Sequence, residues 1–174
     1  METPLFIQFV KSLKASPTVI SFSELYAALQ QGVVDGQENP PSVIYDMRFH
    51  EVQKYLTLSE HVAGTNVMLI NEKFFQSLPV DLRVILLQGV QLARYVEAGE
   101  RAYKNYVSVV EKLKKAGMEV YAPSQDEKAQ FKKLAQPAVV KWVSGLVGEE
   151  FVNQVINEVK LIEAGMEKET ASLK

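Results

Sequence analysis

Two adjacent pairs of an acid and a histidine are the residues of this chain most able to do acid–base or metal chemistry. Glu51 follows His50, and Glu60 precedes His61. A hydrolytic metal site would need a third nitrogen or sulfur ligand, but the chain holds 2 histidines and no cysteine. Neither spacing is typical of a metal site, and no nucleophile, base and oxyanion arrangement accompanies them. We therefore expect no metal, no cofactor and no catalysis, and we interpret both histidines as surface residues.

A polar bend after a short apolar run is the better candidate for chemistry, in this case binding. Val33 and Val34 predict a brief buried strand, and the following Asp-Gly-Gln-Glu-Asn-Pro, residues 35–40, predicts a turn closed by proline. Open α/β sheets bind ligands where a strand ends in such a turn. Asn39 directly precedes Pro40, and asparagine at such a position commonly shapes the turn.

The elements that must position this bend are mainly helices. A capping-box pattern, Ser21 to Glu24, opens the second of them, and Gly32 suits its left-handed end. A second capping box, Ser124 to Glu127, opens a helical carboxyl-terminal part whose last residues, 163–174, are polar and expected to fray. Apolar spacing predicts helices at 4–13, 22–31, 42–49, 71–77, 125–134, 137–147 and 149–162. Extended segments are predicted at 51–55, 62–70 and 118–121.

One predicted helix is too long for a small domain. Apolar residues recur without a proline from Pro79 to Ala116, roughly 57 Å at 1.5 Å per residue, whereas a small domain is only about 30 Å across. The helix must therefore bend at Gly89 or Gly99, or reach along two lobes. A free-standing coiled coil fits less well, because tyrosines and glycines stand where a seam would carry Leu or Ile.

Composition narrows the class of protein. The chain has 174 residues, 47% of them hydrophobic and 23% charged, which is enough apolar material for a globular core. Its net charge is -2 and its basic residues are scattered, which argues against nucleic acid as the main partner. No apolar run is long enough for a membrane span. The amino terminus does not resemble a signal peptide, so we expect either a cytoplasmic protein or residues upstream of Met1.

Long runs of this sequence resemble the solute-binding subunits of tripartite ATP-independent periplasmic (TRAP) transporters of the dicarboxylate type. The resemblance is carried by Ser16-Pro17-Thr18, the ungapped run 22–40, and residues 49–56 and 69–75. It implies an α/β, periplasmic-binding-protein-like fold of two lobes, here incomplete, with the long helix bracing both lobes and a helical carboxyl terminus. It also implies that the chain begins after most of the first lobe, just past an arginine that clamps the ligand carboxylate, and that Met1 occupies an internal position.

The same resemblance divides the chain and assigns roles. Residues 1–64 would form a second-lobe segment with the ligand-facing loop, 65–104 the return to the first lobe and the long helix, and 105–174 the rest of the second lobe. Binding residues would be Asn39, Phe22 and Thr65, although Phe22 could be an ordinary core residue and Thr65 a simple strand threonine. Gln37 and Glu38 would support the loop through hydrogen bonds to backbone. Some relatives place a metal here and a tryptophan after the acid, but Asn39 follows it in this chain, so no metal is expected.

The functional expectation is a carrier and not an enzyme. The resemblance implies a periplasmic protein that binds a small organic acid and delivers it to TRAP membrane permease subunits, without a cofactor. The alternative is a truncated lobe that binds nothing and self-associates as a homodimer or by domain swapping, because missing sheet partners leave open edges and bare apolar faces. Because the selecting residues would lie largely outside this chain, we expect it to bind ligand weakly or not at all when isolated.

Overall fold

The computed structural model describes residues 3–62, 64 and 67–172. These residues form two compact units, Met1–Ser21 together with Ser124–Lys174, and Phe22–Pro123. These two units are defined by which residues pack together, whereas the three segments expected from the sequence were assigned to lobes. The two divisions therefore cannot be compared directly. The assignment of 1–64, 65–104 and 105–174 to lobes therefore stays a prediction.

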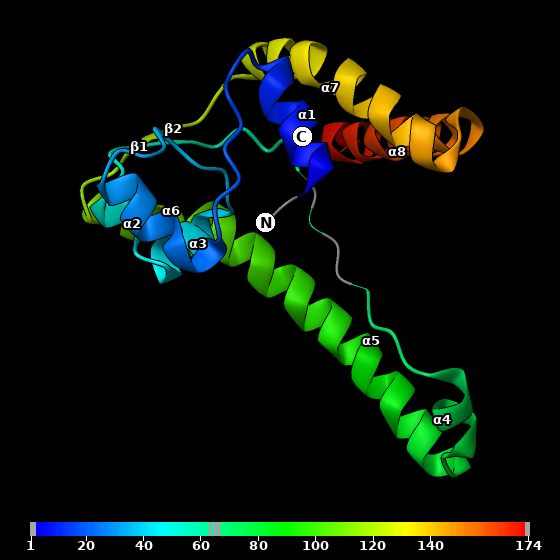
Figure 1. Ribbon diagram of the computed structural model, residues 1–174. Coiled ribbons are helices and arrows are strands. Elements are labelled where there is room, and N and C mark those ends of the chain that lie inside the picture. Colours follow the sequence, from blue (N-terminus) through cyan, green and yellow to red (C-terminus); the bar gives the residue numbers. More distant parts are fainter. Residues whose placement is uncertain (1–2, 63, 65–66, 173–174) are drawn as a thin grey trace. The chain divides into compact units, whose positions relative to one another are not determined.

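The first unit is built from three helices, α1 (Pro4–Ser12), α7 (Gln125–Val147) and α8 (Glu149–Ser172). α1 packs against α7, where the rings of Phe9 and Phe131 lie with centroids 5.8 Å apart. α8 packs along α7 after a turn at Gly148, whose φ of 91° favours glycine (Figure 1). The capping box predicted at Ser124 and Glu127 is confirmed, with both reciprocal hydrogen bonds present.

Two expectations about this unit are wrong. Pro137 does not separate two helices but lies inside α7, so packing along the helix outweighs the cost of about 3 kcal/mol that an interior proline carries. Residues 163–172 are not frayed as expected, because they continue α8 (Glu149–Ser172). Glu163, Ala164 and Met166 are good helix formers, and they extend a helix already begun.

The second unit surrounds a small apolar core. Phe49 and Leu113 are completely buried, each with 0% of its surface exposed. They come from the 3-10 turn Phe49–Glu51 and from α6 (Val109–Lys115), and the core brings these together with α2 (Leu25–Gln30) and α3 (Pro41–Asp46). The buried residues of this cluster are Leu29, Ile44, Phe49, Val109, Leu113 and Met118. Burial of one face of each short helix thus fixes the elements on either side of the polar bend.

A two-stranded parallel sheet lies beside these helices. β1 (Tyr55–Thr57) pairs with β2 (Glu119–Tyr121), with Leu56 opposite Val120 (Figure 1). The predicted strand at 118–121 is therefore confirmed, and the extended segment at 51–55 is strand only from Tyr55. Leu56 and Val120 pack onto the core of the second unit. The fold of this unit is α/β, with a sheet of minimal size.

The predicted strand at Val33 and Val34 is absent from the fold. These residues form a bend in which Val33 is 60% exposed, while Val34 packs against the core. The described residues of 62–70 form no strand either. An isolated strand has no ladder for its backbone groups, and the sheet that the structure describes offers only β1 and β2 as partners.

The second predicted helix begins differently from expectation. Phe22–Glu24 is a 3-10 turn and α2 starts at Leu25, with Glu24 as its N-cap and no side-chain cap hydrogen bond. The α-helical part therefore begins four residues after Ser21, and the predicted capping box at Ser21 and Glu24 stays a prediction. Gly32 takes the expected left-handed conformation with φ of 70°.

The long helical stretch is confirmed. After α4 (Glu72–Ser77), whose N-cap Asn71 accepts a hydrogen bond from the Phe74 backbone, α5 (Val80–Tyr103) continues through one turn of π-helix, Lys104–Ser108, into α6. Gly89 and Gly99 lie within α5 without ending it, and the change of helical pitch falls at the π-turn. Gly117, with φ of 98°, ends the run as predicted. Within the described ranges, no helix combines the length and the apolar character needed to cross a membrane.

Replacing Phe49 with alanine is expected to lower the free energy of unfolding by about 3–5 kcal/mol, because it opens a cavity in a fully packed core. Urea unfolding followed by circular dichroism measures this change. Phe74 is 56% exposed, so Phe74→Ala is the matched control and should shift stability by no more than about 0.5 kcal/mol. Equal effects of the two substitutions would contradict the position assigned to the core.

Candidate functional site

Three amide side chains connect the polar bend to the segment before β1. The Asn39 Nδ2 donates to Gln37 Oε1 at 2.6 Å, and the Gln37 Nε2 donates to Gln53 Oε1 at 3.2 Å. All three residues are partly buried. We call Asn39, Gln37 and Gln53 the amide relay. Gln37 therefore supports the loop through side chains, not through the backbone contacts expected from the sequence.

The far end of the bend is anchored to the long helix. Pro40 is the N-cap of α3 and Pro41 its first residue, which suits proline because the first helical N–H groups have no partner within the helix. The next N–H, that of Ser42, donates to Asn105 Oδ1 at 2.9 Å. Asn105 lies in the π-turn, a feature often found at functional sites. The π-turn of the long helix thus places the Asn105 side-chain oxygen, a hydrogen-bond acceptor, at the start of α3.

Glu38 is held by a histidine that follows β1. His61 Nε2 lies 3.3 Å from Glu38 Oε2, an ion pair when the imidazole is protonated, and His61 Nδ1 lies 2.8 Å from the Ser59 hydroxyl. The His61 side chain is only 17% exposed, so its interpretation as a surface residue is wrong. The sequence pattern gave no hint of this pairing, because the two residues are separated by a helix and a strand.

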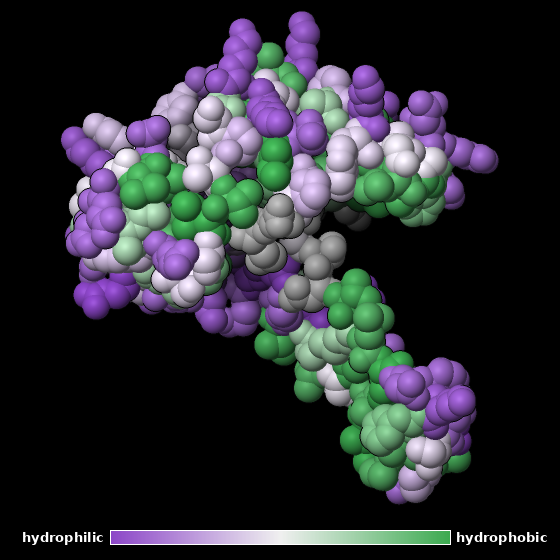
Figure 2. Space-filling view, in the orientation of Figure 1, coloured by the Kyte–Doolittle hydropathy of each residue, from purple (hydrophilic) through white to green (hydrophobic). Residues whose placement is uncertain are grey.

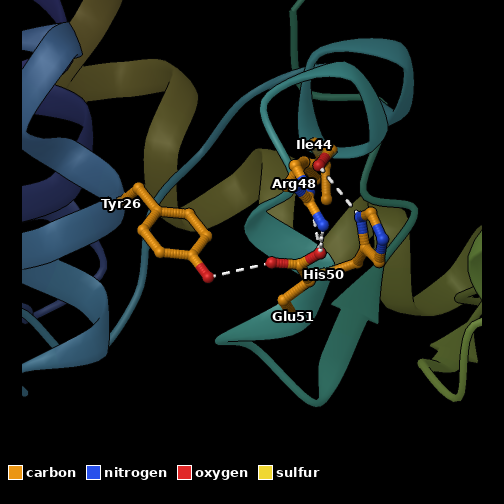
Figure 3. Close-up of polar contacts among 5 residues, drawn as sticks. All are labelled: Tyr26, Ile44, Arg48, His50 and Glu51. Atoms are coloured by element: carbon orange, nitrogen blue, oxygen red, sulfur yellow. Dashed lines mark hydrogen bonds and ion pairs between the residues drawn. The ribbon is translucent and has the colours of Figure 1, made fainter.

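His50 and Glu51 do not form a base and its orienter (Figure 3). The His50 ring is partly buried, stacks on Tyr45 with centroids 5.3 Å apart, and its Nδ1 lies 3.5 Å from the Ile44 carbonyl oxygen. Glu51 instead accepts hydrogen bonds from the Tyr26 hydroxyl at 2.9 Å and from Arg48 Nε at 2.7 Å. The expectation of a surface histidine is therefore wrong here as well, because the neighbouring aromatic ring covers it.

Hydrogen bonding to Glu51 shifts the pKa of two groups. The bond from Tyr26 is the main cause that lowers the pKa of the Glu51 carboxyl, and the bond from Arg48 adds to it. The same bond raises the pKa of the Tyr26 hydroxyl. Since Tyr26 belongs to α2 and Glu51 to the 3-10 turn, the charged carboxylate joins two elements that flank the core.

The other predicted binding residues are less constrained by these contacts. Phe22 is 42% exposed, and its ring meets Phe49 edge-on at 6.1 Å, so part of it packs on the core and part faces outward. This position agrees with either interpretation of Phe22. Thr65 lies outside the described residues. Its neighbour Gly64 is tied to α5, because its carbonyl oxygen accepts a hydrogen bond from Arg101.

The structure also contains features that belong to no predicted site. A hollow of about 390 Å³ lies over the sheet and is lined by β1 and β2, and Asn39 is not among its lining residues. No group of three potential metal ligands occurs among the residues described. Gln53, His61 and Asn105 were missed by sequence reasoning, because each acts through a partner 16 or more residues away.

The sequence of this chain matches a known protein family. The profile of the bacterial extracellular solute-binding proteins, family 7, matches residues 1–145. The chain belongs to this family. The match includes the polar bend and the other runs that carry the resemblance to TRAP solute-binding subunits, and it extends over the long helix. The expected family and its incomplete two-lobe fold class are thereby confirmed.

Curated and solved members of family 7 agree with this assignment. The C4-dicarboxylate-binding periplasmic protein of Rhodobacter capsulatus is 34% identical over 129 residues, which are 74% of this chain and 38% of that protein. A TRAP periplasmic solute-binding protein from Ochrobactrum anthropi superposes with a TM-score of 0.80 at 27% identity, over 95% of this chain and 51% of that one. Another, from Desulfovibrio salexigens with bound orotic acid, gives 0.76 at 32% identity, over 91% and 51%. The chain spans about half the length of these structures.

Replacing Tyr26 with phenylalanine is expected to raise the pKa of Glu51 toward the ordinary value of a glutamate, because the largest cause of its depression is removed. A lowered pKa in the folded state means that this contact stabilises the fold above the ordinary pKa and is lost as the pH falls through the lowered value. Carboxyl-detected NMR titration measures the shift. Tyr103, 58% exposed, provides the control Tyr103→Phe, which should leave Glu51 unchanged. An unchanged Glu51 pKa in Tyr26→Phe would contradict the assigned cause.

Proposed function

We propose that this chain forms part of a periplasmic carrier that binds a small organic acid and delivers it to a TRAP membrane permease. Membership of family 7 is the observation that carries the proposal. Support for the ligand class comes from relatives whose names record a C4-dicarboxylate and orotic acid, both small carboxylates. We propose carriage without catalysis, and in support the His50 ring stacks on Tyr45 while His61 lies against Glu38 of the polar bend.

The binding surface we propose is centred on Asn39. One of its two N–H groups is used by Gln37, which leaves the second N–H and the carbonyl oxygen for a ligand. The exposed part of Phe22 would pack against the carbon skeleton of the ligand, and Thr65 would add a hydroxyl. Gln37 and Glu38 would hold the bend in place. This surface is polar but carries no cation, so the charge that neutralises a carboxylate would come from outside the chain.

If the groups that bind the ligand are divided between this chain and another lobe, we expect the two lobes to close over the ligand. Contacts from two lobes exist together only in the closed state, so the ligand would shift the population toward closure. The permease would then recognise the closed carrier. In the isolated 174-residue chain, only the Asn39 side of the site acts, so we expect dissociation constants of about 1 mM or weaker.

Weak binding of this kind can be measured at the Asn39 side chain itself. In the isolated chain, titration with succinate, malate or orotate is expected to move the Asn39 side-chain amide signals in a ¹⁵N NMR spectrum. Asn39→Ala should weaken binding by about tenfold, the value of one hydrogen bond to a charged group. Asn157, exposed on α8, provides the matched control Asn157→Ala, which should bind as the unaltered chain does.

Two results would overturn the proposal. A micromolar dissociation constant measured by calorimetry in the isolated chain would mean that the ligand site is complete in this chain. That result would contradict a site shared with another lobe. Unmoved Asn39 signals with every acid, at concentrations of about 50 mM where a millimolar site is saturated, would remove Asn39 from the site.

A second candidate, self-association, is favoured by one observation on α5. None of its 24 residues is buried, and the exposed apolar residues Leu82, Ile85, Leu92 and Val96 follow one another at spacings of three, seven and four, which places them along one face. Figure 2 shows apolar side chains gathered along this segment. Burying one such side chain stabilises by about 1.5–3 kcal/mol, so a second copy packed on this face would gain several times that value.

Sedimentation at several concentrations tests this candidate. The chain is expected to dimerise as concentration rises, and Ile85→Lys should weaken the dimer at least about tenfold, because a cation would replace a buried methyl group. Gln91→Lys is the control, since position 91 falls outside the apolar spacing. A monomer at all concentrations would remove self-association as a function of this chain.

A further inference from the structure

We infer that Gln37 and Gln53 are positioning residues that fix the orientation of the Asn39 amide, and so select organic acids that carry a hydroxyl or N–H group. The inference rests on the proposed function, because it concerns what the Asn39 side chain offers to a ligand. Gln53 itself touches no ligand in this scheme and acts through Gln37.

The orientation of the Asn39 amide depends on the direction of the hydrogen bonds in the amide relay. Asn39 donates to the Gln37 carbonyl oxygen, and Gln37 donates to the Gln53 carbonyl oxygen, so both bonds run the same way. Turning the Asn39 amide over would place its oxygen against the Gln37 oxygen. Turning Gln37 over would oppose two NH₂ groups at Asn39 and two oxygens at Gln53. With the Gln53 carbonyl oxygen as the acceptor, the orientations of Gln37 and Asn39 follow from it.

Asn39 keeps hydrogen-bonding groups that the amide relay does not use. An amide has two N–H donors and one carbonyl oxygen, and the relay uses one donor. A ligand bound at Asn39 would therefore be offered one N–H and one carbonyl oxygen. A carboxylate oxygen satisfies the N–H, but the carbonyl oxygen needs a donor, and a partly buried acceptor left without one is costly. A plain dicarboxylate such as succinate has no donor, whereas malate adds a hydroxyl.

Contacts of neighbouring residues hold the bend that carries the amide relay. Glu38 lies between the two relay residues in sequence but pairs with His61, so its carboxylate is directed to a different partner. Ser42, three residues after Asn39, is fixed to Asn105 of the long helix. Because the backbone on both sides of Asn39 is held, the remaining freedom of the side chain is rotation of its amide, and that rotation is what the relay restricts.

The orientation can be tested in the isolated chain without ligand. The Asn39 amide proton that is bonded to Gln37 is expected to lie downfield of its position in an unbonded asparagine, which widens the separation that every primary amide shows between its two protons. In Gln53→Leu the acceptor for Gln37 is lost, so this additional separation should fall by at least half. In Gln53→Glu a carboxylate still accepts from Gln37, so the separation should be retained. Gln91→Leu on α5 is the control and should change nothing.

The ligand selection is tested by comparing malate with succinate in the same NMR titrations. The unaltered chain is expected to bind malate about tenfold more tightly, as one additional hydrogen bond would provide. The ratio of the two dissociation constants should approach one in Gln53→Leu and in Asn39→Ala, and should persist in Gln53→Glu. A merely structural role of Gln53 would weaken both acids equally and leave the ratio unchanged.

The outcomes separate this inference from the proposed function. If both acids move the Asn39 signals and Asn39→Ala weakens the binding of both acids as measured from backbone amide signals, but the ratio is the same in Gln53→Leu, the inference fails and the proposed function stands. If the unaltered chain binds both acids equally, the selection for a donor is wrong. If neither acid moves the signals, the proposed function and this inference fall together.

Discussion

Burial of Phe49 and Leu113 in one apolar core is the constraint on which the rest of the second unit depends. These side chains join the turn after α3 to the end of the long helix, and Leu29 of α2 completes the contact. The polar bend leaves α2 and enters α3, so both its ends are fixed to the same core. Two further contacts, from Asn39 through the amide relay and from Glu38 to His61, restrain its middle. A loop held in this way can present one amide in one orientation.

Apolar surface is distributed unevenly between this core and the long helix. α6 buries Val109, Val110 and Leu113, whereas α5, in the same helical run, buries no residue. A helix in water derives most of its stability from packing an apolar face, and a two-stranded sheet is marginal without further strands. The face of α5 and the sheet therefore need additional partners more than the core does. Family members about twice as long as this chain show that the fold has room for such partners.

Local signals in the sequence predicted much of this fold, and the failures share a physical cause. The helix starting at Ser124, the ends at Gly32 and Gly117, and the long run from α5 to α6 follow from caps and periodicity, which act over a few residues. The strand at Val33 failed because strand formation depends on a distant partner. The partly buried state of His61 and the contacts made by Gln53 and Asn105 could not be predicted either, since each arises from contacts between segments far apart in sequence.

The chemistry of the bend implies a separation of affinity from selectivity. A neutral amide supplies only one hydrogen bond toward holding an anion and no charge to neutralise it, but a site built from fixed donors and acceptors rejects a ligand that leaves one of them unpaired. Glu38 would repel a carboxylate if it faced the ligand, and its pairing with His61 directs that charge elsewhere. A cation supplied by another part of a complete carrier could therefore provide attraction common to all organic acids. The amide relay would then decide among them, because its three side chains fix which hydrogen-bonding group of Asn39 meets each part of the ligand.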